Sequence, residues 1–292
     1  MKWEQSSIGA AVHRFNIDED LARRVSVAGT TRVAEFAARC PRLEHVSLIS
    51  SFYASGLRDG VIAEAPLEPG DLASFTNHYE RSKALSELEL LTRPDLPWNI
   101  YRLGLVIADD IGGSVTQHNA FHRTIRLFHS GHMSIMPGDP ETRLCTLTGA
   151  FAARAVTDMA LARVPHRIVN VVQGAEHARS LDEMLELIYE AFMADPDFCR
   201  RQLPRPIWTE LEGFELLVNG MGALGSPIVR KAFDSVAHFA RQLFVRKVPE
   251  NHNLIAMLPW YAPEDQQELV RRTCAYLIRT RFRRHDAAAA EG

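Results

Sequence analysis

A tyrosine and a lysine four residues apart are the side chains of this sequence best suited to chemistry. They belong to Tyr79-Glu80-Arg81-Ser82-Lys83. On a helix this spacing places the phenol and the ammonium side by side on one face. The chain has 6 tyrosines and only 4 lysines, so the pair is uncommon by chance. The alternative interpretation is a solvated helix face that happens to carry a lysine.

The pair suits proton transfer to or from the oxygen of a carbonyl or alcohol. A phenol in water has a pKa near ~10 and is a poor acid or base at neutral pH. We therefore expect the Lys83 ammonium to lower the pKa of Tyr79 by stabilising the phenolate. Upstream, Ser51 could hold the same substrate oxygen, although a serine there could also simply cap a turn. Lys83 could also hydrogen-bond a ribose and so position a nicotinamide for hydride transfer.

The elements around these residues have the pattern of a βαβ passage. Strand, helix and strand in this order predict a parallel sheet with right-handed crossovers. In such sheets ligands bind beyond the carboxyl ends of the strands, which is where Ser51 is expected. The predicted elements are a helix over Asp18–Cys40 with Asp18 as its N-cap, a buried strand over His45–Ser50, a helix over Leu72–Leu91 and a strand over Trp98–Ile107.

At these residues the sequence resembles the extended short-chain dehydrogenase/reductase family. Ile49–Gly56 is similar to the family's strand segment that ends in an active Ser or Thr, here Ser51. His78–Ala84 resembles its Tyr-x-x-x-Lys helix, and Tyr101–Val106 resembles the strand that contacts the nicotinamide. Weaker similarity continues through Arg167–Val172 and Ser180–Glu183, so the resemblance covers about residues 5–195.

The resemblance implies an α/β fold with a doubly wound, Rossmann-like parallel sheet, and NADP or NAD as the cofactor. Pro41–Glu44 and Arg58–Val61 look most like the thioester reductase and fatty acyl-CoA reductase branch, which reduces acyl thioesters with NADPH. A sugar-nucleotide epimerase or dehydratase is the alternative on the same scaffold. By resemblance, the catalytic residues are Ser51, Tyr79 and Lys83, and the cofactor-binding residues are Ala10, Ser26, Tyr79, Lys83, Leu103 and Val106.

The sequence also departs from the family pattern. Ser26 stands where the family has an asparagine, and Leu103 replaces a proline. Ser7–His13 resembles the end of the family's fourth strand, and no Gly-x-x-Gly-x-x-Gly phosphate turn precedes it. We therefore expect a truncated chain that holds the later half of the cofactor domain. A complementing chain or a homodimer would then complete the site, or the protein is a non-catalytic remnant.

Two other patterns could mark sites. Gly220–Gly225 spells G-x-G-x-x-G after Glu215–Val218 and could hold a dinucleotide, although a glycine turn between packed helices explains it as well. Imidazoles of the kind that zinc binds occur in the segment 118–132, but no Cys, Asp or Glu accompanies them, so we predict no metal site. These imidazoles belong to His118, His122, His129 and His132.

Composition sets the remaining limits. With 292 residues, 46% hydrophobic content and a net charge of −3, the chain can bury a full core and gives no reason to expect nucleic acid as a partner. No apolar run is long enough to span a membrane. The four cysteines are scattered, as reduced thiols are. We therefore predict a cytoplasmic protein that acts on a small molecule or an acyl thioester.

The predicted domains divide near the middle of the chain. Residues 1–175 would form the later half of an NAD(P)-binding Rossmann-like domain, and residues 176–292 a mostly helical C-terminal substrate lobe. The helices predicted in this lobe cover Leu181–Met193, Trp208–Val218, Pro227–Leu243 and Glu264–Arg284.

Overall fold

A computed structural model describes residues 5–8, 17–68, 74–224, 230, 233–234 and 236–283 of the chain. The chain forms two compact units that alternate along the sequence. Unit 1 consists of Met1–Leu105, Ala152–Glu176 and Lys247–Pro263, and unit 2 of Val106–Phe151, His177–Arg246 and Glu264–Gly292. One crossing between them, at Glu176 and His177, falls beside the boundary predicted between residues 175 and 176. The division into two contiguous domains stays a prediction.

A four-stranded parallel sheet forms the centre of unit 1. Its order is β1-β2-β4-β9, so consecutive strands in space are joined by crossovers. Ser51, the last residue of β2, lies opposite Leu103 at the end of β4. The parallel α/β sheet predicted from the sequence is therefore confirmed. The strands are β1 (Gln5–Ile8), β2 (His45–Ser51), β4 (Trp98–Leu103) and β9 (Arg167–Val171).

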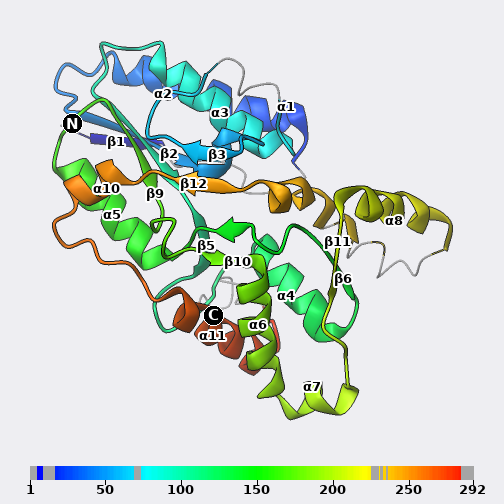
Figure 1. Cartoon of the computed structure of the whole chain (residues 1–292). Helices are drawn as coiled ribbons and strands as arrows, with labels where there is room; N and C mark the ends of the chain where they lie inside the picture. Colours follow the sequence, from blue (N-terminus) through cyan, green and yellow to red (C-terminus); the bar gives the residue numbers. More distant parts are fainter. Residues whose placement is uncertain are drawn as a thin grey trace, which may run out of the picture. The chain divides into compact units, whose positions relative to one another are not determined.

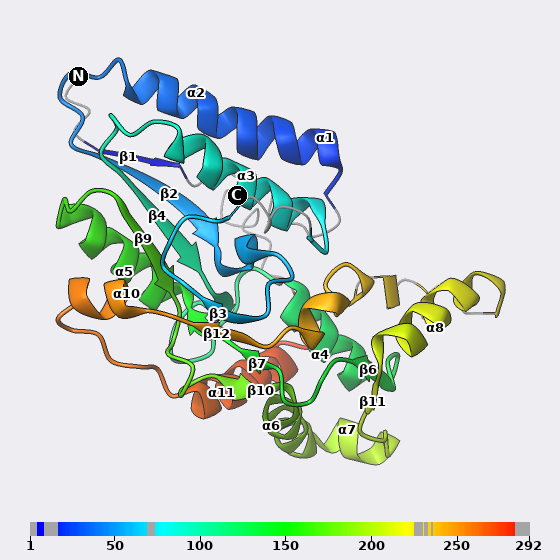
Figure 2. The same cartoon turned by 45° about the horizontal axis from the view of Figure 1, so that its top comes forward.

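Helices cover both faces of this sheet, which explains why the strands are apolar on both sides. α2 (Ala28–Ala37) and α3 (His78–Leu91) lie on one face, and α5 (Gly149–Leu161) and α10 (His252–Met257) on the other (Figures 1 and 2). The core between the sheet and the first pair of helices consists of Ala34, Ala37, Val46, Leu48, Leu90, Leu96, Ile100 and Ile168.

The helix predicted over Asp18–Cys40 is present but not regular. It begins as α1 (Glu19–Ala22), where the Asp18 carboxylate accepts a hydrogen bond from the Leu21 amide at 3.1 Å. This confirms Asp18 as the N-cap. One π-helical turn, η1 (Arg23–Val27), then joins α1 to α2. Such turns are frequent at functional sites, and the apolar periodicity of the sequence does not reveal this one.

Two predicted boundaries are wrong. α3 begins at His78, because the Asn77 side chain caps it by accepting a hydrogen bond from the Glu80 amide at 2.9 Å. Residues 74–77 are not helical, and Leu72 lies outside the described residues. The strand predicted over Trp98–Ile107 is divided at Gly104 into β4 and β5 (Leu105–Ala108), which pairs with β8 (Thr146–Thr148) in a separate sheet.

Unit 1 also contains a small parallel ribbon beside the end of β2. A short 3-10 helix, η2 (Phe52–Ser55), follows Ser51 directly and leads to β3 (Gly60–Ile62). β3 pairs with β12 (Lys247–Pro249), a strand from far along the chain. The ribbon therefore fixes the segment that leaves the carboxyl end of β2.

Unit 2 combines helices with short two-stranded sheets. The Ser180 and Glu183 capping box starts its α6 helix as predicted, and α11 begins after Asp265. No helix among the described residues is long and apolar enough to cross a membrane. The helices with described bounds in this unit are α4 (Ala120–Ser130), α6 (Leu181–Met193), α7 (Pro196–Arg201), α8 (Leu211–Leu224), η4 (Ala240–Phe244) and α11 (Gln266–Arg279). Its further strands are β6 (Ile135–Pro137), β7 (Arg143–Leu144), β10 (Arg179–Ser180) and β11 (Ile207–Thr209).

Candidate active site

Ser51 and Tyr79 meet at the carboxyl end of the central sheet. Ser51 ends β2, and its hydroxyl accepts a hydrogen bond from the Tyr53 amide at 3.2 Å, which caps η2. The same side chain hydrogen-bonds with Tyr79, in the first turn of α3. The cap interpretation of Ser51 is therefore confirmed, and its role in holding a substrate oxygen stays a prediction that its contact with Tyr79 allows. This is the edge at which parallel sheets bind ligands.

Burial controls the acidity of Tyr79. Removal from water raises the pKa of Tyr79 to about 12, while the hydrogen bond with Ser51 lowers it and the charge of Glu80 raises it. The lowered pKa expected from Lys83 is therefore wrong for this structure. The Lys83 nitrogen lies 5.9 Å from the centre of the Tyr79 ring. The free energy needed to bury a phenolate exceeds the electrostatic stabilisation that the ammonium gives it from there. Tyr79 thus carries its proton at neutral pH.

Lys83 lies one helical turn further along α3 and is only 4% exposed. Its ammonium donates a hydrogen bond to the carbonyl oxygen of Ile49 in β2 at 2.8 Å. Burial lowers the pKa of Lys83 to about 8, and the charge of Glu87 opposes this by raising it. Tyr79 and Lys83 thus share one face of α3 and point to the same strand, as their spacing predicts.

A buried ion pair that the sequence analysis missed lies behind Lys83. The Arg102 guanidinium in β4 contacts Glu87 of α3 through Nε at 3.1 Å to both carboxylate oxygens and through a terminal nitrogen at 2.8 Å. Glu87 also accepts a hydrogen bond from the Ser50 hydroxyl. The available signal was the position of Glu87, which is four residues after Lys83 on the same helix face.

Further contacts hold the two segments that carry Ser51 and Tyr79. The buried Glu80 carboxylate accepts hydrogen bonds from the Thr76 amide at 3.3 Å and the Asn77 side chain at 3.1 Å, which fixes the first turn of α3. On the other side, the buried Lys247 ammonium donates to the Ser55 hydroxyl at 2.8 Å and the Gly56 carbonyl at 2.6 Å. The sequence did not identify Lys247, which lies nearly two hundred residues further along the chain.

The structure locates three of the other four predicted cofactor-binding residues. Ser26 is buried in the π-helical turn η1, which packs against α3. Leu103 is the register partner of Ser51. Val106 belongs to β5 and to unit 2, and Ala10 lies outside the described residues. Contacts between these residues and a cofactor stay predictions.

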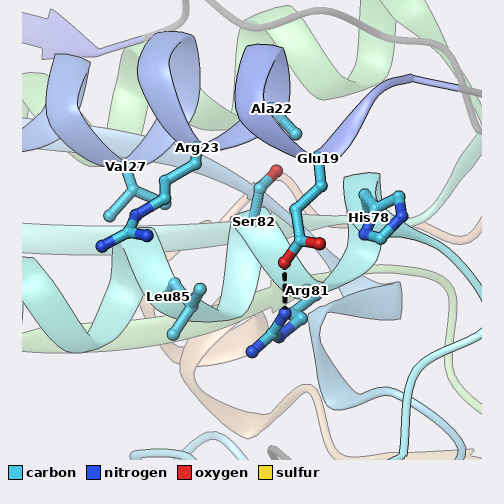
Figure 3. Close-up of a pocket in the computed structure, with 8 residues that line it drawn as sticks. All are labelled: Glu19, Ala22, Arg23, Val27, His78, Arg81, Ser82 and Leu85. Atoms are coloured by element: carbon cyan, nitrogen blue, oxygen red, sulfur yellow. Dashed lines mark hydrogen bonds and ion pairs between the residues drawn. The ribbon is translucent and has the colours of Figure 1, made fainter.

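A surface groove with a volume of about 310 Å³ runs between the α1–η1 segment and α3 (Figure 3). An ion pair of 2.7 Å joins Arg81 and Glu19 across it. Tyr79 and Lys83 do not line this groove, so it belongs to a different face of α3 from the one that contacts β2. The lining residues are Glu19, Ala22, Arg23, Val27, His78, Arg81, Ser82 and Leu85.

The G-x-G-x-x-G pattern does not have the context of a dinucleotide site. A phosphate-binding turn needs a strand before it and a helix after it. Glu215–Val218 and Gly220 instead belong to one continuous helix, α8, which confirms a helix in this segment but begins at Leu211 and not at Trp208. Gly225 lies outside the described residues, as do 227–229, 231–232 and 235 of the predicted helix over Pro227–Leu243, and the end of that range belongs to the 3-10 helix η4.

The histidines of unit 2 have structural partners. His122 accepts a hydrogen bond from the Asn119 amide at 2.9 Å and contacts the Ile107 carbonyl at 2.9 Å through its other nitrogen. Burial lowers the pKa of His122 to about 4. His129 lies 2.8 Å from the Asp195 carboxylate. Among the described residues, no three His, Cys, Asp or Glu side chains are grouped to hold a metal ion.

Comparisons with known proteins agree with this architecture. The terminal R domain from the myxalamid PKS-NRPS biosynthetic pathway superposes with a TM-score of 0.70 at 18% identity, over 95% of this chain and 68% of that one. The UDP-glucuronic acid 4-epimerase from Bacillus cereus in complex with NAD gives 0.65 at 12% identity, over 95% and 75%. An archaeal thiolation-reductase di-domain from a non-ribosomal peptide synthetase gives 0.61 at 15% identity, over 96% and 58%.

A search of curated proteins by sequence finds no match. The family model described as male sterility protein, an NAD-binding domain, matches residues 8–156, which is more than half of the chain. This stretch contains β2, α3 and β4, and with them Ser51, Tyr79 and Lys83. The chain therefore belongs to the male sterility protein family of NAD-binding domains, within the extended short-chain dehydrogenases/reductases.

Proposed function

We propose that this chain is an NAD(P)-dependent oxidoreductase that reduces the carbonyl group of an acyl thioester or an aldehyde. The observation that carries the proposal is the hydrogen-bonded pair of Ser51 and Tyr79 at the carboxyl end of the sheet, with the buried Lys83 ammonium beside it. These are the three groups that a carbonyl reduction needs: one to hold the oxygen, one to protonate it, and a cation to stabilise the phenolate left behind.

The steps assigned to the protein follow from these side chains. Ser51 holds the substrate carbonyl oxygen beside the Tyr79 hydroxyl. The bound cofactor supplies the hydride that adds to the carbonyl carbon. As negative charge develops on the oxygen, Tyr79 donates its proton to it, and the phenolate is stabilised by Lys83 and reprotonated from solvent. With a thioester, the carbon–sulfur bond then breaks, the thiol leaves and an aldehyde results.

The residues present fit the nicotinamide end of a dinucleotide. Lys83 provides a buried ammonium that can donate hydrogen bonds to ribose hydroxyls. Leu103 supplies an apolar side chain level with Ser51, and we assign further contacts to Ala10, Ser26 and Val106. Either NAD or NADP satisfies these contacts, because none of them touches the adenosine ribose on which the two differ.

The protonation state of Tyr79 is compatible with reduction. With a pKa of about 12, the phenol carries its proton at neutral pH and can donate it to the oxyanion that forms on hydride addition. The similarity to a reductase di-domain from a peptide synthetase supports the same direction.

A sugar-nucleotide epimerase or dehydratase is the second candidate. It is supported by the similarity to the epimerase whose structure contains NAD, which superposes with a TM-score of 0.65. The two candidates share Ser51, Tyr79 and Lys83 and differ in substrate, so only turnover separates them.

The test is a substrate comparison with the full chain. NADPH and NADH are each offered with a long-chain acyl thioester or a long-chain aldehyde, and NAD⁺ is offered with UDP-glucose. Loss of reduced nicotinamide and formation of sugar products are both followed. The proposal expects oxidation of the reduced cofactor with the thioester or the aldehyde. Conversion of the UDP-sugar without net change in the cofactor would instead establish the second candidate.

We further propose a cytosolic location, because all four cysteines are free thiols, as a reducing compartment requires. Completion of the site by a second copy of this chain or by a complementing chain stays a prediction. Co-elution of cofactor with a single species or with a dimer of the purified chain would separate these arrangements.

A further inference from the structure

Three polar contacts join one face of α3 to the end of β2. Tyr79 hydrogen-bonds with Ser51, Lys83 with the Ile49 carbonyl, and Glu87 with the Ser50 hydroxyl. The three helix residues are spaced four apart, so they form a single row along the helix. The first two belong to the proposed chemistry, and the third continues the row into the interior of the protein.

Glu87 is fully buried and rigidly held. Arg102 grips both of its carboxylate oxygens, and the same guanidinium is fixed at its other end by the carbonyl oxygens of Ala63 at 3.1 Å and Ala65 at 3.0 Å. A carboxylate in a two-pronged contact with arginine has little freedom to move. Buried ion pairs often contribute little to the free energy of unfolding compared with apolar side chains of similar size. A functional role is therefore the better explanation for this pair.

We infer that Glu87 is a positioning residue of the active site. Its carboxylate is held in place by Ser50 and Arg102, and it keeps the Lys83 ammonium charged one helical turn from Tyr79. This inference rests on the proposed function, because it assigns Glu87 a part in the same proton transfer. Glu87 touches neither substrate nor cofactor in this scheme, and it acts only through Lys83.

The electrostatics around Lys83 support this role. Burial alone would drive the lysine towards its neutral form, and Glu87 opposes that shift, which leaves the pKa of Lys83 at about 8. Without Glu87, burial would act unopposed, and the lysine would lose charge nearer to neutral pH. Other ionisable groups on α3 and on the elements around it include Tyr79 and Glu80 in α3, His45 in β2, Arg102 in β4, Tyr53 in η2, Glu19 and Asp20 in α1, Arg23 and Arg24 in η1, and Arg32 and Glu35 in α2.

The protonation of Lys83 can be measured without any substrate. The chain contains only four lysines, so side-chain labelling with ¹³C or ¹⁵N gives few NMR signals, and Lys83→Arg identifies the one of interest. We expect Glu87→Gln to lower the pKa of Lys83 so that its acid dissociation constant rises by about tenfold or more. Glu89→Gln is the matched control, because Glu89 lies on the same helix but is partly exposed and pairs with Arg93.

A second variant guards against misfolding. Glu87→Gln leaves the buried Arg102 without its carboxylate, which can unfold the protein, whereas Glu87→Gln combined with Arg102→Met removes both charges together. The inference expects the Lys83 titration to move down in the double variant as well. An unchanged titration in whichever variant folds would overturn it.

Turnover supplies an independent readout. In the Glu87 variants, kcat at neutral pH should fall and recover as the pH is lowered, because acid restores the charge of Lys83. A purely structural role would give a loss that no pH restores, and that result would also overturn the inference. If the wild-type chain turns over no substrate, the proposed function fails, while the NMR titration still decides the role of Glu87.

Discussion

At the scale of single residues, the sequence predicted which side chains meet but not how their acidity is set. Helical spacing and the end of a predicted strand were enough to bring Ser51, Tyr79 and Lys83 together. The direction of the Tyr79 pKa shift was predicted wrongly, because neighbouring charges are visible in a sequence and burial is not. In the structure burial dominates and raises the pKa of Tyr79 to about 12.

The charge of Lys83 should control the pH dependence of turnover. Since its pKa is about 8, the ammonium is lost as the pH rises through 8, whereas Tyr79 keeps its proton up to about 12. We therefore expect kcat of the reduction to fall above pH 8 with a slope of one proton. The pH–rate profile of the wild-type chain measures this, and a profile that stays flat from pH 7 to pH 10 would contradict it.

We expect Lys83 to be needed for turnover and to destabilise the folded chain at neutral pH. The pKa of Lys83 is lower in the folded chain than the 10.5 of an ordinary lysine, so between about pH 8 and 10.5 the unfolded chain binds more protons. The contribution of Lys83 to the free energy of unfolding therefore rises as the pH increases from about 8 to 10.5. We expect Lys83→Met to abolish turnover and, at pH 7, to raise the free energy of unfolding by about 2 kcal/mol. Urea unfolding at pH 7 and pH 10 tests whether this gain shrinks with pH.

At the scale of elements, apolar periodicity found the helices and strands, and local side-chain chemistry decided their ends. Asp18 was identified as a cap, but Asn77 was not, and α3 begins six residues later than predicted as a result. The π-helical turn that holds Ser26 could not be predicted, because one turn of altered hydrogen bonding leaves the apolar spacing almost unchanged.

The turn after Ser51 depends on Gly56. Its φ of +58° favours glycine, and a Cβ added there would collide with the Ser74 carbonyl oxygen. Gly60 also has a positive φ, +77°, but a Cβ there would meet nothing within 4 Å. We therefore expect Gly56→Ala to cost more than about 2 kcal/mol and to impair turnover, and Gly60→Ala to cost only about 1 kcal/mol. Equal losses in chemical denaturation would show that the crowding at Gly56 is not important.

At the scale of the whole molecule, the parallel sheet was predictable and the long-range contacts were not. Alternating strand and helix patterns indicated a parallel sheet, which the structure confirms. The pairing of β3 with β12 and the burial of Lys247 against the turn after Ser51 join segments about 190 residues apart, and neither segment carries a signal of its partner. The sequence left the G-x-G-x-x-G pattern open between a dinucleotide turn and a glycine turn, whereas the structure places Gly220 inside α8.

We expect Lys247 to stabilise the contact between β12 and the turn after Ser51. Replacement by methionine leaves the Ser55 hydroxyl and the Gly56 carbonyl without their buried donor, and we expect a loss of about 2 kcal/mol in the free energy of unfolding. Arg246→Met removes the same charge one residue away, where the side chain is 60% exposed and pairs with Asp139. That variant should lose less than about 1 kcal/mol. Thermal shift measurements compare the two variants. Similar losses of stability in both would contradict the role of the buried Lys247 hydrogen bonds.

The central claim is that Tyr79 donates the proton in a cofactor-dependent reduction. The most direct measurement compares Tyr79→Phe with the wild-type chain, with NADPH binding by titration calorimetry and turnover of the best acyl thioester or aldehyde measured on the same preparations. Because the ring remains and only the hydroxyl is lost, we predict that NADPH still binds and that kcat falls by about 10²- to 10⁴-fold. Equal turnover by both proteins would contradict the account, since the proton would then come from another group.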